Sequence, residues 1–316
     1  MTRKMTLDII TSAYNEEDCL PELFNRLENV LRKEKKYKYQ IHIMDNGSSD
    51  RTWEIINKFS ALDKRIIGYR MSRNFTLDSA LTCGLDQATA DIAIVMCSDL
   101  QDPPETIPTL LRKFEEGYDQ VLVKIASRDS VPWFRRALSK LFYRIARFMT
   151  DKMLPESVSD FRLINRKTYI AIRNMRESHR FLRGLGAWVG FKTIEIEINR
   201  PPRFSGESKW LGVSLFKVIT IASRSILAYS ATPLIWISTL GFIFSLISFI
   251  GVSILSLTWI IAGVPFAGYG TIVGFISLGF SLTMLSIGVL AQYLGLIYEE
   301  VKQRPLYIIS EKSHLI

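Results

Sequence analysis

Charge is what this 316-residue chain lacks near its C-terminal end. No Asp, Glu, Lys or Arg occurs between Arg224 and Glu299. This interval is long enough for two membrane spans of about 20 residues each, which we place at 233–261 and 269–297. A buried helical hairpin of a soluble protein is the alternative, but so long an uncharged stretch makes it the weaker interpretation.

Cysteine is also scarce, since the chain has only Cys19, Cys83 and Cys97. Their spacing fits neither a disulfide framework nor a metal site, which is typical of a protein from a reducing compartment. The N-terminal segment MTRKMTLDII lacks the apolar core of a signal peptide, so we expect the first domain to stay in the cytosol. Lys and Arg flank both ends of the uncharged stretch. The positive-inside rule therefore predicts a multi-pass protein of the inner (plasma) membrane with both termini cytosolic.

A formal net charge of +9 indicates an anionic partner. The expected spans favour anionic membrane lipid as that partner and argue against nucleic acid. Residues 133–149, WFRRALSKLFYRIARFM, combine Arg and Lys with aromatic residues at helical spacing. A buried helix with a solvated rim is the alternative, but we interpret this segment as a basic amphipathic helix on the bilayer surface.

Four strand-and-helix repeats fill the first part of the chain. Apolar strands are predicted at 7–13, 40–44, 66–71 and 92–97, and a segment with helical spacing follows each. This alternation predicts an α/β fold with a parallel, doubly wound sheet, in which the loops after the strands meet at one edge. The loops are rich in Asn, Asp, Glu and Ser, so we expect a pocket for a polar, nucleotide-sized ligand.

An acidic sequence, SDLQDPPE, follows the fourth predicted strand. Asp99 and Gln101 can both turn toward one hard cation such as Mg²⁺ or Mn²⁺, which would then clamp a diphosphate. The alternative is an acidic turn before a helix that starts near Pro104. The position at the carboxyl end of a central strand, where open α/β sheets bind ligands, favours the metal site.

Several segments occur in an order that resembles the successive signatures of family 2 glycosyltransferases: SAYNEED, MDNGSSDRT, SRNFTLDSALTCGLDQA and DLQDPPE. The resemblance continues through DFRLINR, RFLRGLGAWVG, RPPRFSGESKW and YLGLIYEEVKQRP, and so covers nearly the whole chain. It is strongest to the polyprenyl-phosphate branch, which includes bactoprenol glucosyltransferases and dolichyl-phosphate mannose synthases. It implies a GT-A, Rossmann-like nucleotide-diphospho-sugar transferase domain, a nucleotide-sugar donor, a divalent metal and a polyprenyl-phosphate acceptor.

The resemblance also implies roles for single residues. Asp99 and Gln101 match the metal ligands, and Asp160 matches an acid near the transferred sugar or the acceptor. Whether Asp160 acts as a base or positions the sugar stays open, and a structural turn residue is the alternative. Donor-side positions are Tyr14, Glu16, Asp45, Asn46, Cys97 and Ser98. Contacts with donor or lipid phosphate are implied for Arg128, Arg135, Ser139, Arg203, Ser208 and Lys209.

The chain departs from the family pattern at a few of these positions. Cys97 and Asn46 stand where the family usually has Asp, and Thr76-Leu77 where it commonly has Gly-Lys. We therefore expect the donor nucleoside to be held differently, unless Cys97 only completes a buried strand. The QxxRW signature of processive synthases is absent, which disfavours a polymer-extending enzyme. A catalytically weakened scaffold subunit is the other alternative.

Together with the expected spans, the resemblance implies a membrane-anchored, metal-dependent, inverting enzyme. It would move one sugar from a nucleotide sugar, UDP-glucose or a related UDP-sugar, to undecaprenyl phosphate. The expected order is a transferase domain at 1–210, a juxtamembrane helix at 211–230, two spans within 231–298 and a cytosolic tail at 299–316. The spans carry no ionisable residue, so we expect an anchor and a packing surface, with a homo-oligomer as a candidate assembly.

Overall fold

The computed structural model describes residues 4–126, 158–178, 180–202, 204–205, 232–262 and 268–313. The chain divides into two units, one holding residues 1–147, 152–218 and 305–316, the other holding residues 148–151 and 219–304. The basic helix expected at 133–149 and the juxtamembrane helix expected at 211–230 lie outside the described residues.

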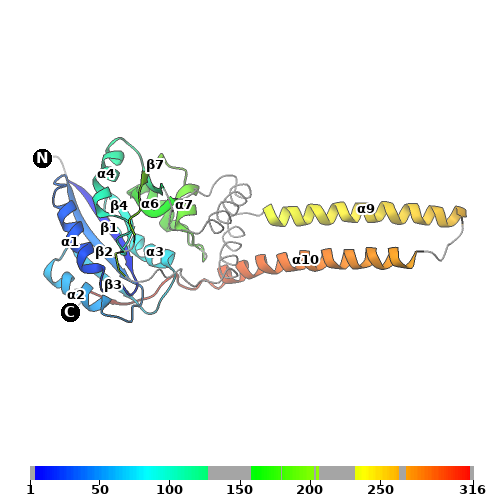
Figure 1. Cartoon of the computed structure of the whole chain (residues 1–316), viewed down its shortest axis with the longest axis horizontal. Helices are drawn as coiled ribbons and strands as arrows, with labels where there is room; N and C mark the ends of the chain where they lie inside the picture. Colours follow the sequence, from blue (N-terminus) through cyan, green and yellow to red (C-terminus); the bar gives the residue numbers. More distant parts are fainter. Residues whose placement is uncertain are drawn as a thin grey trace. The chain divides into compact units, whose positions relative to one another are not determined.

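One mixed sheet forms the centre of the first unit (Figure 1). Within the described residues its eight strands have the order β7-β5-β6-β4-β1-β2-β3-β8. The strands are β1 (Met5–Ala13), β2 (Tyr37–Asp45), β3 (Ile66–Met71), β4 (Ile92–Cys97), β5 (Gln120–Ile125), β6 (Val158–Asn165), β7 (Thr193–Ile198) and β8 (Ile309–Lys312). The four strands predicted from the sequence pair in parallel, which confirms that expectation. The sheet as a whole is not all parallel, because β6 runs antiparallel to β4 and β5, and β8 runs antiparallel to β3.

Helices cover both faces of this sheet. They are α1 (Leu20–Leu31), α2 (Thr52–Leu62), α3 (Leu77–Gln87), the 3₁₀ turn η1 (Pro104–Thr106), α4 (Ile107–Glu115), α6 (Arg166–Asn174) and α7 (Leu182–Trp188). The apolar stripe of α1 packs into one core with Leu7 and Ile9 of β1. On the other face, Cys83 of α3 packs against Met44 and Tyr69. Strand β1 is buried from Leu7 onward, as expected for a central strand of a doubly wound sheet.

The second unit contains two long apolar helices, α9 (Thr232–Ala262) and α10 (Tyr269–Val301), which agree with the spans expected at 233–261 and 269–297. Leu234–Gly251 and Leu278–Val301 are long and apolar enough to cross a membrane by length and composition. At 1.5 Å per residue, each helix is longer than the hydrocarbon core of a bilayer, which is about 30 Å thick.

Part of the segment that we expected to be a cytosolic tail, 299–316, pairs with the sheet of the first unit. Ile309–Lys312 forms β8, which pairs with β3 at the edge of the first unit's sheet. The strand has only four residues, too few for an alternating pattern to identify it in the sequence.

Candidate active site

The loops after β1 and β2 are joined by direct hydrogen bonds at the carboxyl ends of these strands. The Asn15 amide donates to Ser48 Oγ at 3.0 Å, and the Ser49 amide donates to Asn15 Oδ1 at 2.9 Å. The Glu16 amide donates to Thr52 Oγ1 at 2.9 Å. Asn15 has a φ of 51°, a left-handed conformation that Asn tolerates better than most residues. The two loops therefore form one rigid rim.

Asn46 connects this rim to the loop after β3. Its Nδ2 donates to the carbonyl oxygen of Phe75 at 3.0 Å, and its Oδ1 accepts from the Phe75 amide at 2.9 Å. The next residue, Gly47, has a φ of 72°, and a Cβ there would lie 2.4 Å from the carbonyl carbon of Arg73. Asn46 and Gly47 therefore both allow the β3 loop to approach closely. The side-chain amide of Asn46 both donates to and accepts from Phe75, which an ionised carboxylate cannot do.

The loop after β4 is attached to the same edge. Ser98 is buried, and its hydroxyl donates to the carbonyl oxygen of Ser12 at 2.8 Å. The expectation that the four polar loops meet at one edge of the sheet is therefore confirmed by these contacts and those of Asn15 and Asn46.

Asp99 and Gln101 lie on either side of a left-handed residue. Leu100 has a φ of 60°, which is uncommon for a residue with a branched side chain, and its side chain is buried in the core. The reversal brings the Gln101 amide to 3.2 Å from Asp99 Oδ1. Both side chains are only partly buried, so their oxygens remain accessible at the rim.

These two residues fit a hard divalent cation. Within the described parts of the chain no group of three or more His, Cys, Asp or Glu side chains could hold a metal by itself. Mg²⁺ commonly takes only one or two protein oxygens and completes its octahedron with substrate phosphate and water. The carboxylate of Asp99 and the amide oxygen of Gln101 match that requirement.

Asp102, three residues after Asp99, has a different environment. It is fully buried, and its Oδ2 accepts from the Cys97 amide at 3.0 Å. Its Oδ1 accepts from Arg200 Nη2 at 3.1 Å and from Ser159 Oγ at 3.3 Å. Burial raises its pKa, and the charge of Arg200 opposes this effect. Asp102 therefore fastens the β4 loop to Arg200 rather than facing a ligand.

Cys97 lies beside these carboxylates at the end of β4. Burial raises the pKa of its thiol well above the usual value, and the nearby charges, that of Asp102 first, add to this effect. The thiol is therefore neutral. An aspartate at this position would add a further anion next to Asp99 and Asp102.

Asp45, at the end of β2, has one carboxylate oxygen that accepts no hydrogen bond from the described residues. Its Oδ1 accepts from the Ser48 amide at 3.0 Å. Its Oδ2 is buried, accepts no hydrogen bond from the described residues and lies 3.4 Å from Arg70 Nε. Burial raises the pKa of Asp45, while the bonds from Ser48 and the charge of Arg70 lower it. A buried, incompletely satisfied oxygen of this kind is the acceptor that an N–H or O–H of a bound nucleoside would need.

Asp160 lies on β6, and a guanidinium holds both its oxygens. Arg183 Nε donates to Oδ1 at 2.8 Å and Arg183 Nη2 to Oδ2 at 2.6 Å, while Arg162 Nη2 lies 3.9 Å from Oδ1. Burial alone would raise the pKa of Asp160, but the bonds and charge of Arg183, with other nearby arginines, hold it below its usual value. Asp160 is therefore a fixed anion and a weak base.

A second acid, Asp78 of α3, lies near this pair. Its Oδ1 accepts from the Leu182 amide at 3.0 Å. Burial, together with the charge of Asp160, raises the pKa of Asp78 to about 6. The pKa values of the two neighbouring carboxylates are thus shifted in opposite directions. Asp160 is ionised, and Asp78 ionises less readily.

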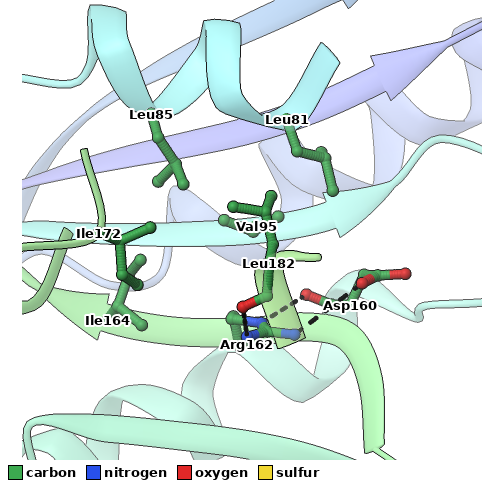
Figure 2. Close-up of a pocket in the computed structure, with 8 residues that line it drawn as sticks. All are labelled: Leu81, Leu85, Val95, Asp160, Arg162, Ile164, Ile172 and Leu182. Atoms are coloured by element: carbon green, nitrogen blue, oxygen red, sulfur yellow. Dashed lines mark hydrogen bonds and ion pairs between the residues drawn. The ribbon is translucent and has the colours of Figure 1, made fainter. Parts of the chain in front are cut away.

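A small, mostly apolar cavity lies next to these acids (Figure 2). Leu81 and Leu85 of α3 line one side, and Asp160 and Arg162 of β6 line the other. The cavity has room for about one water-sized group, which is too little for a sugar or a nucleotide. It is therefore not the substrate site.

Other donor-side and phosphate positions are described only in part. Tyr14 and Glu16 lie in the β1 loop that forms the rim, and Glu16 is buried. The six residues expected at phosphate all lie outside the described residues: Arg128, Arg135, Ser139, Arg203, Ser208 and Lys209. The segment around position 203 is described on either side, where Arg200 pairs with Asp102 and Ser205 Oγ donates to Asp18 Oδ2 at 3.1 Å.

Three arginines with contacts at the site had no predicted role: Arg70, Arg183 and Arg200. Arg183 lies within the matching segment RFLRGLGAWVG, so a signal for it was present. Arg70 and Arg200 bind acids from distant parts of the sequence, and no local pattern identifies such partners.

Comparisons with known proteins point to one family. Residues 8–173 match the model of glycosyl transferase family 2. An uncharacterized glycosyltransferase of Synechocystis sp. is 39% identical, over 96% of this chain and 95% of its own. The bactoprenol glucosyl transferase of Shigella phage SfII is 34% identical, over 98% of this chain and 99% of its own. The prophage bactoprenol glucosyl transferase homolog of Escherichia coli is also 34% identical, over 96% and 98% of the two chains.

A solved structure supports the fold. Glucosyl-3-phosphoglycerate synthase from Mycobacterium tuberculosis, crystallised with Mn²⁺, UDP and phosphoglyceric acid, superposes with a TM-score of 0.50 and 12% identity. The match covers 71% of this chain and 76% of that one. At this identity the likeness concerns the fold, which is that of nucleotide-sugar transferases.

Proposed function

The chain belongs to glycosyl transferase family 2, and on this premise we propose that it moves one sugar from a nucleotide sugar to polyprenyl phosphate. The donor is UDP-glucose or a related UDP-sugar, and the acceptor is undecaprenyl phosphate. An acceptor phosphate oxygen attacks the anomeric carbon as the bond to the nucleoside diphosphate breaks. Direct in-line attack of this kind inverts the anomeric centre.

The observation that carries this proposal is the end-to-end similarity to proteins named bactoprenol glucosyl transferase. That similarity covers nearly all of each sequence, so it includes the two apolar helices as well as the α/β unit. A likeness confined to the family's catalytic domain would leave the acceptor unspecified, since that fold serves many acceptors.

The donor occupies the rim where the four loops meet. Asp45 Oδ2, which accepts no hydrogen bond from the described residues, would accept one from the nucleoside. Tyr14 and Glu16 lie on the adjoining loop. Asn46 acts on this site indirectly, because both ends of its amide are engaged by Phe75. Cys97 supplies a neutral surface, where a carboxylate would add a further negative charge beside Asp99.

Asp99 and Gln101 would hold Mg²⁺ or Mn²⁺ in the donor site. When bound, the cation acts as a Lewis acid that stabilises the negative charge of the departing nucleoside diphosphate. The protein's own part is to fix the two oxygens by the Leu100 reversal and by the Asp102–Arg200 pair. Preorganised ligands need no rearrangement during the reaction.

The acceptor needs positioning more than proton removal. A lipid phosphate is already anionic near neutral pH, so a general base contributes little to its attack. Asp160, held by Arg183 with a lowered pKa, fits the role of an anion that orients a sugar hydroxyl. Arg and Lys of the phosphate set, Arg203 and Lys209 among them, would receive the lipid phosphate.

The two apolar helices anchor the enzyme in the inner (plasma) membrane, with the catalytic unit and both termini in the cytosol. Their length and composition support this placement. The Lys and Arg residues that flank the uncharged stretch support the orientation. Basic residues of 133–149 would bind anionic lipid around the acceptor.

A transfer assay tests the proposal. Purified full-length protein in detergent would receive radiolabelled nucleotide sugars, short polyprenyl phosphate and Mg²⁺, with Asp99→Ala as the matched inactive control. We expect one labelled sugar on the lipid, sensitive to chelator. A labelled polymer would indicate a processive synthase. Failure with every sugar tested, under conditions where a bactoprenol glucosyl transferase works, would indicate a scaffold subunit.

A further inference from the structure

The segment that follows α10 completes the catalytic sheet. In β8, Glu311 stands directly opposite Arg70 of β3, and Ile309 stands opposite Met71. Beyond the strand, the Ser313 amide donates to the Gly68 carbonyl oxygen at 2.9 Å. Ser313 Oγ accepts from the Gly68 amide at 2.7 Å. The segment is therefore docked by main-chain and side-chain bonds.

Three charged residues form a row across neighbouring strands. Asp45 of β2 stands opposite Arg70 of β3, which in turn stands opposite Glu311 of β8. Arg70 Nε lies 3.4 Å from Asp45 Oδ2, and Arg70 Nη1 donates to Glu311 Oε1 at 3.2 Å. Opposite charges on directly facing positions of a sheet attract each other, so the guanidinium is held between two carboxylates.

The outer carboxylate is itself held in place. Trp53 Nε1 donates to Glu311 Oε2 at 3.0 Å, so the two Glu311 oxygens have separate partners. Trp53 is buried in α2, and the guanidinium of Arg70 lies 5.9 Å from the centre of its ring. The indole thus fixes Glu311, and Glu311 fixes one end of Arg70.

This arrangement leaves the buried Oδ2 of Asp45 incompletely satisfied. With Nη1 bound to Glu311, only the long Nε contact reaches Asp45 Oδ2, which accepts no hydrogen bond from the described residues. Without the charge at position 311, both ends of the guanidinium are free to close on Asp45. Arg70 would then compete with a bound nucleoside for the same oxygen.

We propose that Glu311 is a positioning residue for the donor nucleotide, which it affects by holding Arg70 away from the carboxylate of Asp45. The inference rests on the proposed function, in which Asp45 contacts the donor nucleoside. It assigns a role in donor binding to a segment that follows both apolar helices in the chain.

Calorimetry of UDP binding to the full-length protein, with Mg²⁺ present, tests the proposal. Glu311→Gln keeps the size of the side chain and the acceptor for Trp53 but removes the charge. We expect its Kd for UDP to rise about two- to fivefold, the range of a partly exposed ion pair. Lys312→Gln is the matched control, since it changes the charge of the same strand by one but lies against Tyr69. Its Kd should equal that of the wild type.

A double-mutant cycle separates positioning from a general effect of the strand. In an Arg70→Gln background, Glu311→Gln should change the Kd no further, because its effect passes through Arg70. Equal effects of Glu311→Gln with and without Arg70 would overturn the inference, as would an unchanged Kd in the single variant or an equal rise in Lys312→Gln. If the wild type binds no nucleoside diphosphate at all, the proposed function fails, and this inference with it.

Discussion

Both side-chain oxygens of Asp160 accept hydrogen bonds from the Arg183 guanidinium, at 2.8 and 2.6 Å. Asp160 is buried while Arg183 is about a quarter exposed, so the pair has one face toward solvent. Bidentate pairs of this kind fix orientation as well as charge. The pair therefore fixes the orientation of the Asp160 carboxylate on β6, next to the β4 loop.

Removing the guanidinium should change the pH dependence of the reaction. In Arg183→Ala, the pKa of Asp160 rises, because burial then acts without its main opposing partner. Activity that needs ionised Asp160 is lost as the pH falls through that pKa. The acidic limb of the kcat/KM profile should therefore move to higher pH, and kcat/KM at neutral pH should fall about tenfold or more.

Arg183→Lys is the matched control for this change. It keeps one positive charge but not the fork of two donors, so its acidic limb should lie between those of the wild type and Arg183→Ala. An acidic limb that stays in place in Arg183→Ala would show that Asp160 does not control the reaction.

Asp99 and Asp102 should respond oppositely to substitution. Asp99→Ala should remove most transfer activity at saturating Mg²⁺ and leave the Tm close to that of the wild type, because Asp99 is partly exposed. Asp102→Asn should lower stability by about 1–3 kcal/mol, because it weakens the ion pair between the buried Asp102 and the partly exposed Arg200. Thermal unfolding and transfer assays on both variants check this. A stable, active Asp99→Ala would exclude the metal site.

Asp78 should make the protein less stable as the pH rises from about 4 to 6. Its pKa is about 6 in the folded protein and near 3.9 in the unfolded chain, so the folded state holds the proton over that interval. The unfolded state binds fewer protons there, and stability therefore falls with rising pH and then levels off above pH 6.

Asp78→Asn removes this ionisation and can still accept the bond from Leu182. We expect it to stabilise the protein by about 1–3 kcal/mol at pH 7.5, and by less at pH 4. Unfolding curves at the two pH values measure the difference. A gain that is the same at both pH values would contradict the assignment.

Asn46 should not tolerate the aspartate that is usual in the family. A carboxylate cannot donate to the Phe75 carbonyl oxygen, which would then face an anion. Asn46→Asp should therefore lower stability by about 1–3 kcal/mol and weaken donor binding through the displaced β3 loop. Asn46→Ala, which removes the bonds without adding a charge, is the comparison. Tighter UDP binding by Asn46→Asp would instead show that a direct donor contact is missing in the wild type.

The first four strands and the two apolar helices could be predicted because their signals are local. Each strand is a short apolar run that ends in polar residues, and β3 and β4 begin and end where the pattern placed them. The antiparallel β6 and the short β8 could not be predicted, since their pairing depends on partners far along the chain. Edge pairing of this kind leaves little trace in a four-residue segment.

In the site, too, residues within one motif could be predicted, and partners from distant parts of the chain could not. The sequence places Asp99 and Asp102 in one motif, and only the structure shows that Asp99 is partly exposed while Asp102 is fully buried. The sequence also marks Asp160, but its partner Arg183 comes from a different element, α7. The pKa of Asp160 depends on this partner, which no local pattern in the sequence identifies.

The position of β8 in the chain determines when the sheet can be completed during synthesis. A ribosome makes β3 early and β8 only after both apolar helices, and the bond from Trp53 to Glu311 spans 258 positions. Until then the outer edge of β3 has unpaired main-chain groups, which are prone to pair with other chains. The sheet is thus completed after the helical hairpin has been synthesised. If the acceptor is a membrane lipid, as proposed above, the enzyme would finish folding only once the two apolar helices are made.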